Sequence, residues 1–367
     1  MKTKTIKMRA AEQPRRVINS AAPIRICDFG GWTDTWFARH GCILNIGVYP
    51  YAEVQIEVRH WDGDGDRVVI NAENFGERYA LRRVRKTGWD RHPLLEAAIA
   101  YMHIPDDLAF EVTIFSEAPS GASTGTSSAV TVAMVGALDQ LTPGRLSPHE
   151  VAYAAQAIET ELLQQQCGIQ DQLCAAFGGI NYIDMHAYPR ATVSPIVIPN
   201  AVWWELERRL MLVYLGNTHN SSQVHEKVIR ELEDAGPEVP ALRELRATAP
   251  KARDALYAGD FDTLGRTMIE NHEAQRRLNP ALISRAADEI VAIAREHGAI
   301  GWKVNGAGGD GGSLTLLSGS LSTHKRAAIR AIEAANPHFR NIPLYLSRFG
   351  LRVWEQHDVA PVHRAHA

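Results

Sequence analysis

A run of small residues from Pro119 to Ala129 (PSGASTGTSSA) joins two segments of different periodicity. The segment before it, Leu108–Phe115, predicts a strand, and an apolar segment from Ser127 to about Leu141 predicts a buried helix. Small side chains let backbone N–H groups approach an anion, and the start of a helix adds unpaired N–H donors and a favourable dipole. The run therefore predicts a phosphate site, although a plain loop with a serine N-cap also explains it when it is taken alone.

Two common phosphate-binding motifs are excluded for this run. The chain contains no G-x-x-x-x-G-K-[ST] sequence, and Gly121 and Gly125 have the wrong spacing for a G-x-G-x-x-G turn. Ser127 and Ser128 lie where a hydroxyl could cap the helix, touch a phosphate or ligate Mg²⁺. We therefore expect phosphate contacts from backbone amides and hydroxyls, without the lysine of a P-loop.

A second glycine-rich run, Asn305–Gly312 (NGAGGDGG), lies between the strand-like segments Gly301–Val304 and Ser313–Leu317. A hairpin turn needs only one or two glycines, so this run predicts unusual backbone angles or a close approach to a ligand. A flexible hairpin is the alternative. Two such loops in one chain favour a phosphate-bearing substrate more than either loop does alone.

The chain has 367 residues, more than one compact domain usually holds, so we expect two domains. The pattern loosens around Pro189–Pro199, which gives domains of 17–195 and 196–367. Strands and helices are mixed without regular alternation, which predicts an α+β fold with two lobes. The expected helices are Leu94–Met102, Ser127–Leu141, Pro148–Gln165, Ser221–Ala235, Ala241–Ala258, Leu282–His297 and His324–Ala335, and the expected strands include Cys42–Val48, Tyr51–Val58, Leu108–Phe115 and Leu210–Leu215.

Composition excludes several classes of protein. Hydrophobic residues make up 45% of the chain and charged residues 22%, and this composition is too apolar for a disordered chain. The net charge of −3 predicts no nucleic-acid surface. No apolar run has the length of a membrane span, and the first residues lack the apolar segment of a signal peptide. Cys27, Cys42, Cys167 and Cys174 form no CxxC pair, which argues against structural zinc and a disulfide scaffold. We expect a cytoplasmic protein with no nucleic-acid or membrane partner, whose oligomeric state, a homodimer included, stays open.

Three acidic positions are candidates for chemistry. Asp171 could accept a proton from a substrate hydroxyl, or it could simply cap a helix. Glu161 could bind Mg²⁺, with Glu159, which faces another side of the helix, as the alternative. Asp34 follows a glycine pair and could meet sugar hydroxyls, or it could be a turn aspartate. Trp32 could stack on a sugar face, or it could pack in the core.

Taken together, three segments resemble the motifs of the GHMP kinase family, the group of galactokinase, homoserine kinase, mevalonate kinase and phosphomevalonate kinase. The segments are Ala22–Asp34 (APIRICDFGGWTD), Pro119–Ala129 and Asn305–Gly312, in the family's order. The resemblance implies a two-lobed fold, with an N-terminal lobe like the second domain of a small-subunit ribosomal protein and a ferredoxin-like C-terminal lobe. It also implies ATP as phosphoryl donor and Mg²⁺ as cofactor.

Within the family the chain resembles sugar kinases. Residues 167–172 (CGIQDQ) are similar to a galactokinase segment, residues 171–182 to bacterial D-glycero-D-manno-heptose 7-phosphate kinases, and residues 30–35 (GGWTDT) to fucokinases. The resemblance implies phosphoryl transfer to a sugar anomeric hydroxyl, with D-glycero-D-manno-heptose 7-phosphate as first candidate. A fucose, galactose or related free-sugar 1-kinase, a mevalonate or homoserine kinase, and a non-catalytic sugar and ATP sensor are the alternatives. Candidates for binding a substrate phosphate are Arg39, His40, His219 and Lys303.

The family pattern implies roles for individual positions. Asp171 would act as the base, with Arg25 beside it to stabilise its ionised form or the phosphoryl charge. The ATP phosphates would be bound by Pro119, Gly121, Ala122, Ser123, Thr124, Gly125, Thr126, Ser127 and Ser128; the sugar by Gly30, Gly31, Trp32, Asp34, Gly306, Gly308 and Gly309; and Mg²⁺ by Ser128 and Glu161. Ser123-Thr124 departs from the Gly-Leu of the family motif, and the role of Asp310 stays open.

Overall fold

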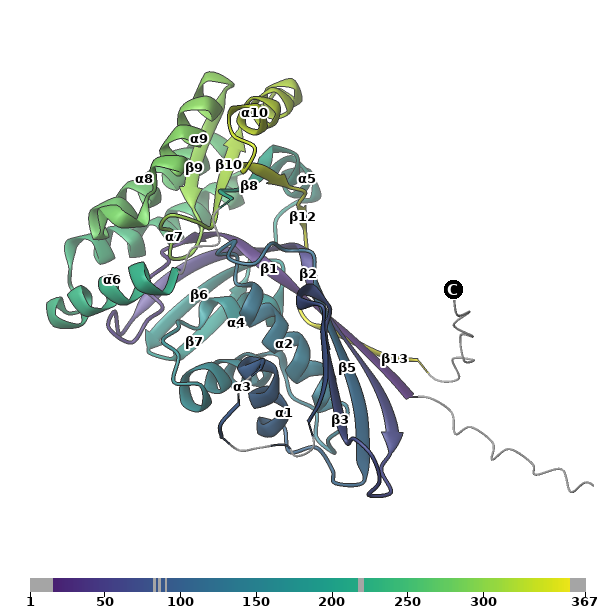
Figure 1. Cartoon of the computed structure of the whole chain (residues 1–367). Helices are drawn as coiled ribbons and strands as arrows, with labels where there is room; N and C mark the ends of the chain where they lie inside the picture. Colours follow the sequence, from purple (N-terminus) through teal and green to yellow (C-terminus); the bar gives the residue numbers. More distant parts are fainter. Residues whose placement is uncertain (1–15, 82–83, 85–86, 90, 217–220, 357–367) are drawn as a thin grey trace, which may run out of the picture.

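The computed structural model describes residues 16–81, 84, 87–89, 91–216 and 221–356. Two lobes are built on two sheets (Figure 1). The first sheet has nine strands in the order β13-β1-β2-β5-β3-β4, with β12 and β6 paired to β2, and β7 paired to β6. Its strands are β1 (Arg16–Phe29), β2 (Gly41–His60), β3 (Val68–Ala72), β4 (Glu77–Leu81), β5 (Leu108–Ser116), β6 (Ile180–Ala187), β7 (Arg190–Pro195), β12 (Tyr345–Leu346) and β13 (Arg352–Gln356).

The long strand β2 runs through both strands expected at Cys42–Val48 and Tyr51–Val58. In its second half, Val54 and Ile56 are buried while Glu53 and Gln55 are exposed, which is the alternation of a sheet with one solvated face. Its first half is buried almost throughout, because β1 and β6 pair with it on either side and helices pack against it. The sheet therefore forms one layer of the first lobe, and helices pack against it.

Four helices gather on one side of this sheet: α1 (Pro93–Tyr101), α2 (Thr126–Asp139), α3 (Pro148–Ala157) and α4 (Gln170–Phe177) (Figure 1). The helix α2 is buried along nearly its whole length, as its apolar sequence predicts. The helix expected over Pro148–Gln165 is regular only to Ala157 and continues as a wider π-helical turn, Ile158–Leu162. That turn changes which side chains face inward, with consequences for the site described below.

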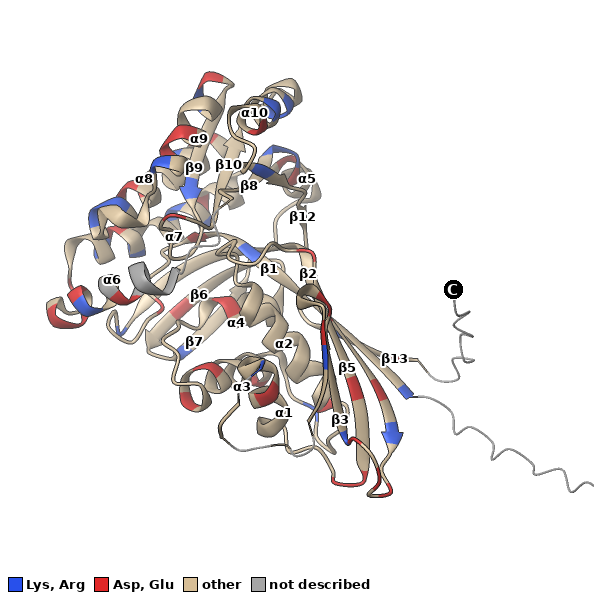
Figure 2. Ribbon diagram, viewed as in Figure 1, with Lys and Arg blue, Asp and Glu red and all other residues tan. Residues whose placement is uncertain are grey.

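The second lobe is built on an antiparallel sheet in the order β11-β8-β10-β9. Charged side chains are spread over the helices of this lobe, whereas α2 in the first lobe carries few (Figure 2). The elements are β8 (Leu210–Tyr214), β9 (Ala299–Val304), β10 (Ser313–Ser318), β11 (Arg340–Ile342), α5 (Asn200–Arg209), α6 (Ser221–Ala235), α7 (Pro240–Ala258), α8 (Phe261–Leu278), α9 (Arg285–Glu296) and α10 (Ser322–Ala335).

The helix α8 was not predicted from the sequence. Asp260 caps its N-terminus by accepting a hydrogen bond from the backbone N–H of Thr263. Gly265, which lowers helix propensity, is needed for close packing: a Cβ there would lie 2.4 Å from the backbone oxygen of Ile300 in β9. Tertiary contact with the sheet therefore stabilises a helix that local preference does not predict.

The chain returns to the first lobe near its end. Tyr345 and Leu346 of β12 pair with β2, and β13 pairs with β1 from Val17↔Gln356 to Ala21↔Arg352. These two strands lie beyond the division predicted at residue 196 and belong to the first sheet. No helix within the described residues is long and apolar enough to cross a membrane.

Candidate active site

A cleft of about 1260 Å³ lies where the two glycine-rich loops approach each other. It is lined by the loop before α2, by the start of α4, by Gly306 and Ala307, and by one side of α6. The predicted residues that line it are Arg25, Trp32, Asp34, Gly121, Ala122, Ser123, Thr124, Gly125, Thr126, Ser127, Ser128, Asp171 and Gly306. Segments nearly 300 residues apart in the chain thus meet in one place.

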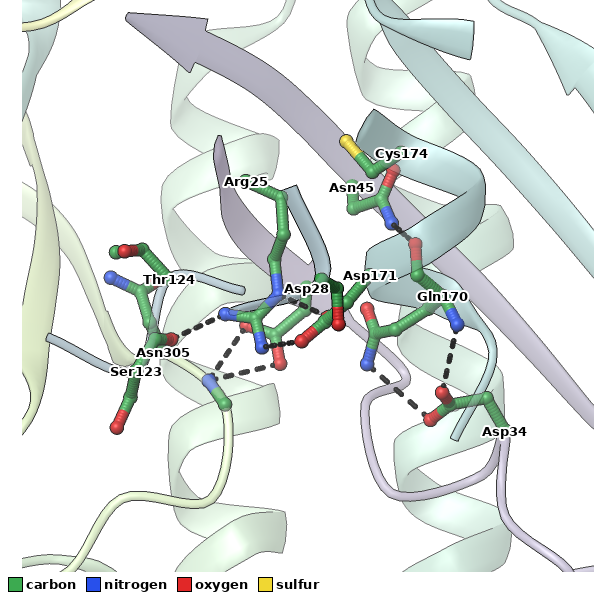
Figure 3. A network of polar contacts seen from close by, with 12 residues as sticks. Arg25, Asp28, Asp34, Asn45, Ser123, Thr124, Gln170, Asp171, Cys174 and Asn305 are labelled. Carbon is green, nitrogen blue, oxygen red and sulfur yellow. Dashed lines mark hydrogen bonds and ion pairs between the residues drawn. The ribbon is translucent and has the colours of Figure 1, made fainter. Parts of the chain in front are cut away.

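Arg25 and Asp171 form a bidentate ion pair at the centre of the cleft (Figure 3). Nε of Arg25 lies 2.7 Å from Oδ1 of Asp171, and its Nη2 lies 3.1 Å from Oδ2. The third nitrogen, Nη1, donates to the backbone oxygen of Ser123 at 2.5 Å. Burial by itself lowers the pKa of Arg25, but the carboxylates of Asp171 and Asp28 outweigh burial and raise that pKa above its ordinary value. The guanidinium is therefore a fixed positive charge between the first glycine-rich loop and α4.

The first glycine-rich loop lies directly against the Asp171 carboxylate. Gly125 has a φ of +69°, and a Cβ there would lie 3.0 Å from Cγ and Oδ2 of Asp171. Gly125 is also the N-cap residue of α2, so the free N–H groups of that helix begin beside the carboxylate. Glycine is required here for both the backbone angle and the close approach.

Ser128, Glu159 and Gln172 form a buried polar cluster on one side of the loop. Oε1 of Glu159 accepts hydrogen bonds from Oγ of Ser128 at 3.2 Å and from Nε2 of Gln172 at 2.9 Å. Burial raises the pKa of Glu159 to about 7, although the two hydrogen bonds oppose that rise. Glu161, the predicted Mg²⁺ ligand, is instead exposed and does not line the cleft. Glu159, the alternative named from the sequence, is buried and lines the cleft, so the Mg²⁺ ligand stays a prediction that Glu159 fits better than Glu161.

The oxygens of Ser128 and Glu159 fit the chemistry of Mg²⁺, which prefers hydroxyl, carboxylate and phosphate oxygens. Among the described residues, no group of three or more histidine, cysteine or acidic side chains is arranged to hold a metal by itself. A pair of protein oxygens completed by substrate phosphates and water is the usual arrangement for Mg²⁺ in phosphoryl-transfer sites. The cluster therefore suits a metal that arrives with a nucleotide.

Asp34 anchors the start of α4. Its Oδ2 accepts the backbone N–H groups of Ile169 at 3.0 Å and Gln170 at 3.1 Å, and its Oδ1 accepts Nε2 of Gln170 at 3.3 Å. Burial, with a smaller contribution from the charge of Asp171, raises the pKa of Asp34 to about 6. The carboxylate thus satisfies N–H groups at the helix start and still lines the cleft, so the two interpretations made from the sequence are compatible.

Several predicted contact residues do not line the cleft. Pro119, Gly30, Gly31, Gly308 and Gly309 are outside it. The glycines serve close packing: a Cβ on Gly30 would lie 1.9 Å from the backbone oxygen of Cys42, one on Gly31 2.6 Å from the Asp28 carboxylate, and one on Gly308 2.1 Å from the backbone oxygen of Leu282. Glycine is needed at these positions because backbone or buried side chains approach them.

Asp28 has a role that was not predicted from the sequence, and Lys303 was one of the candidates for binding a substrate phosphate. The Nζ of Lys303 lies 2.7 Å from Oδ1 of Asp28, and both side chains are buried. Asp28 also accepts the backbone N–H of Gly306 at 3.1 Å through Oδ2. Burial raises the pKa of Asp28, but Lys303 and Arg25 outweigh burial and lower it below its ordinary value. A charged residue in each of two buried strands was the available signal, since such residues usually occur as pairs.

Two of the other candidates for binding a substrate phosphate also lie away from the cleft. Arg39 and His40 are exposed and do not line it, while His219 lies outside the described residues. A cation that does line it is Arg230 of α6, which the sequence analysis did not single out.

Segments of the chain match known proteins at the level of the family. Residues 93–179 match the family model described as GHMP kinases N terminal domain, and residues 252–341 match GHMP kinases C terminal. The chain is 29% identical over 347 residues to a D-glycero-alpha-D-manno-heptose 7-phosphate kinase of Campylobacter jejuni, covering 92% of this chain and 99% of that protein. It is 30% identical over 258 residues to a mevalonate kinase of Pyrococcus furiosus, covering 68% of this chain and 70% of that protein.

Solved structures show the same fold. A D-glycero-D-manno-heptose 1-phosphate kinase from Bacteroides thetaiotaomicron superimposes with a TM-score of 0.72 at 22% identity, covering 93% of this chain and 100% of that one. A galactokinase of Lactococcus lactis complexed with galactose has a TM-score of 0.69 at 17% identity, covering 92% and 95%. The two-lobed α+β fold expected from the sequence is confirmed, and the chain belongs to the GHMP kinase family.

Proposed function

We propose that this kinase transfers the γ-phosphoryl group of ATP to the anomeric hydroxyl of a sugar, with D-glycero-D-manno-heptose 7-phosphate as first candidate. The observation that carries the proposal is the Asp171–Arg25 pair, held in one cleft with the amide-rich start of α2. The similarity to a heptose 7-phosphate kinase over nearly the full length of both chains supports the choice of substrate.

In this proposal Asp171 accepts the proton of the acceptor hydroxyl as its oxygen attacks the γ-phosphorus. Arg25 holds the carboxylate in place through two hydrogen bonds and supplies positive charge where negative charge develops. The N–H groups of the loop before α2 bind the phosphates through their partial positive charge. Ser128 and Glu159 would hold Mg²⁺, which neutralises phosphate charge when bound. Catalysis on this plan is mostly positioning and charge stabilisation.

A kinase for a free sugar is the second candidate, and one observation favours it. Of the α6 side chains that the structure describes, Arg230 lines the cleft together with Glu226 and Glu233. Two carboxylates beside one guanidinium would weaken the binding of a phosphate group that the sugar already carries. Whether the acceptor carries a phosphate is therefore a separate question from the reaction.

The test is an ADP-release assay with a panel of acceptors: D-glycero-D-manno-heptose 7-phosphate, mannose, fucose, galactose, mevalonate and homoserine. We expect turnover with a sugar, and Asp171→Asn should lower kcat by ~10²- to 10⁴-fold while the KM for ATP changes little. Asp184→Asn, on an exposed position of β6, is the matched control and should behave as wild type. Binding of sugar and ATP without turnover would instead support a sensor, and full activity of Asp171→Asn would remove Asp171 from its role.

A further inference from the structure

The side chain of Gln170 lies between two carboxylates of the cleft, those of Asp34 and Asp171 (Figure 3). It belongs to the first turn of α4, directly before Asp171, and only 6% of the residue is exposed. Its backbone is held at both ends: the N–H donates to Oδ2 of Asp34 at 3.1 Å, and the carbonyl accepts Nδ2 of Asn45 at 3.2 Å. The side chain therefore has a fixed place in the wall of the cleft.

The orientation of the Gln170 amide follows from its neighbour. Asp34 has a pKa of about 6, so at pH 7.5 it is ionised and can only accept hydrogen bonds. The NH₂ end of Gln170 must then face it, and Nε2 does donate to Oδ1 of Asp34 at 3.3 Å. The carbonyl oxygen, Oε1, is consequently turned away from Asp34.

That carbonyl oxygen is buried and has no hydrogen-bond partner within the described part of the chain. A buried acceptor without a partner costs about 1–3 kcal/mol, and folded proteins rarely leave one unless a ligand or water supplies the donor. Gln170 is one of the residues that line the cleft, so the missing donor is one that a molecule bound there would supply. The unsatisfied acceptor next to Asp171 is thus a second polar contact point for whatever Asp171 acts upon.

We propose that Gln170 determines acceptor specificity: its Oε1 accepts a hydrogen bond from the hydroxyl next to the one that Asp171 deprotonates. This inference rests on the proposed function, in which the attacking group is an anomeric hydroxyl. The only carbon-borne hydroxyl next to it on the ring is the one on C2. An acceptor without that hydroxyl leaves Oε1 buried and unpaired, and a site built around a hydrogen bond rejects such analogues strongly.

The competing explanation is that Gln170 acts only as a positioning residue, which ties Asp34 to the start of α4. The variant Gln170→Met separates the two, because it keeps the length and the backbone N–H to Asp34 but removes the side-chain carbonyl. A positioning role would lower activity on every acceptor alike. A specificity role changes the ratio of activities between an acceptor and its 2-deoxy analogue.

The experiment measures kcat/KM for D-glycero-D-manno-heptose 7-phosphate and its 2-deoxy analogue, and for mannose and 2-deoxyglucose, the 2-deoxy analogue of mannose. In wild type we expect kcat/KM to be ~10- to 100-fold lower for the 2-deoxy analogue than for the accepted sugar. In Gln170→Met the two kcat/KM values should agree within about threefold, because the carbonyl that discriminates between the two acceptors is gone. Gln55→Met, on the exposed side of β2, is the control and should keep the wild-type ratio.

A wild-type ratio retained in Gln170→Met overturns the inference while the sugar kinase proposal stands. Absence of turnover by wild type on either parent sugar and on the rest of the panel instead overturns the proposed function, and the inference with it. If Gln170→Met does not fold, Gln170→Asn serves in its place, since it keeps the amide but withdraws the carbonyl by one methylene. An unchanged ratio in Gln170→Asn counts against the inference, and a narrowed ratio supports it.

Discussion

Lys303 and Asp28 form a buried ion pair, 2.7 Å long, that joins β9 of the second lobe to β1 of the first. Asp28 also accepts the N–H of Gly306, and its charge raises the pKa of Arg25. The pair thus connects the second glycine-rich loop to the Arg25–Asp171 pair at the centre of the cleft. Asp28 lines the cleft while Lys303 is fully buried outside its lining, and the pair helps to position the residues that face the substrate.

Removing one member of this ion pair should destabilise the protein strongly. Asp28→Asn and Lys303→Met each leave a buried charge without its partner, and we expect each to lower the free energy of unfolding by ~3–5 kcal/mol. The double variant should lose less than the sum of the two, since no uncompensated charge remains. Urea denaturation of the four proteins measures this, and strictly additive losses would contradict it.

Gly306 should tolerate no side chain. A Cβ there would lie 2.9 Å from the backbone oxygen of Ser123 and 3.0 Å from Nη2 of Arg25, and the φ of +58° disfavours any other residue. Gly306→Ala is expected to displace Arg25 and to lower kcat by ~10²-fold or more, since an ångström of misplacement can cost that much. Gly144→Ala, where no atom lies within 4 Å of the added Cβ, is the matched control for the kinetic assay. Equal kcat values for the two variants would show that the contact at Gly306 is unimportant.

The two neighbouring glutamates should differ in their effect on the Mg²⁺ requirement. Glu159→Gln removes the carboxylate that accepts Oγ of Ser128, and we expect the Mg²⁺ concentration for half-maximal activity to rise by ~10- to 100-fold. Glu161→Gln, on the exposed side of the same turn, should leave it unchanged. Titration of activity with Mg²⁺ at saturating ATP distinguishes them, and the reverse order of effects would restore Glu161 to the role predicted from the sequence.

Asp34 should make stability depend on pH in a defined direction. Its pKa is raised from an ordinary 3.8 to about 6 in the folded protein, so between these values the folded state keeps a proton that the unfolded state has lost. Stability should therefore fall as pH rises from 4 to 6, by on the order of 3 kcal/mol for this group.

The variant Asp34→Asn lacks this group. Between pH 4 and 6 the wild type should therefore lose stability relative to the variant, and above pH 6 the difference between the two should stay constant. Free energies of unfolding for both proteins from pH 4 to 8 give the comparison. A constant difference across the series would mean that the Asp34 carboxylate titrates as it does in the unfolded chain.

Much of the architecture was accessible from the sequence because local and tertiary preferences agree there. The apolar segment expected from Ser127 forms α2 from Thr126, and the strand expected over Leu108–Phe115 forms β5. The helix α8 was missed because Gly265 and a polar composition hide a helix that the contact with β9 stabilises. Local preference is a weak guide wherever a neighbouring element determines the outcome.

The site was predictable in its residue types more than in its geometry. Arg25 and Asp171, predicted side by side, do form an ion pair. The spacing of Glu159 and Glu161 puts them on different sides of the turn, but only the structure shows that Glu159 is the buried one. The acceptor of Gln170 and the ion pair of Lys303 with Asp28 became visible only once segments far apart in the chain were placed in contact.

The return of β12 and β13 to the first sheet has a consequence for how the protein is made. β13 is the outermost partner of β1, the strand that carries Arg25, yet more than 300 residues separate the two in the chain. During synthesis, β1 cannot pair with β13 until the whole second lobe has been synthesised. Until then that edge of β1 has no strand to pair with, and an unpaired edge can pair with another chain unless a chaperone or another part of the nascent chain covers it.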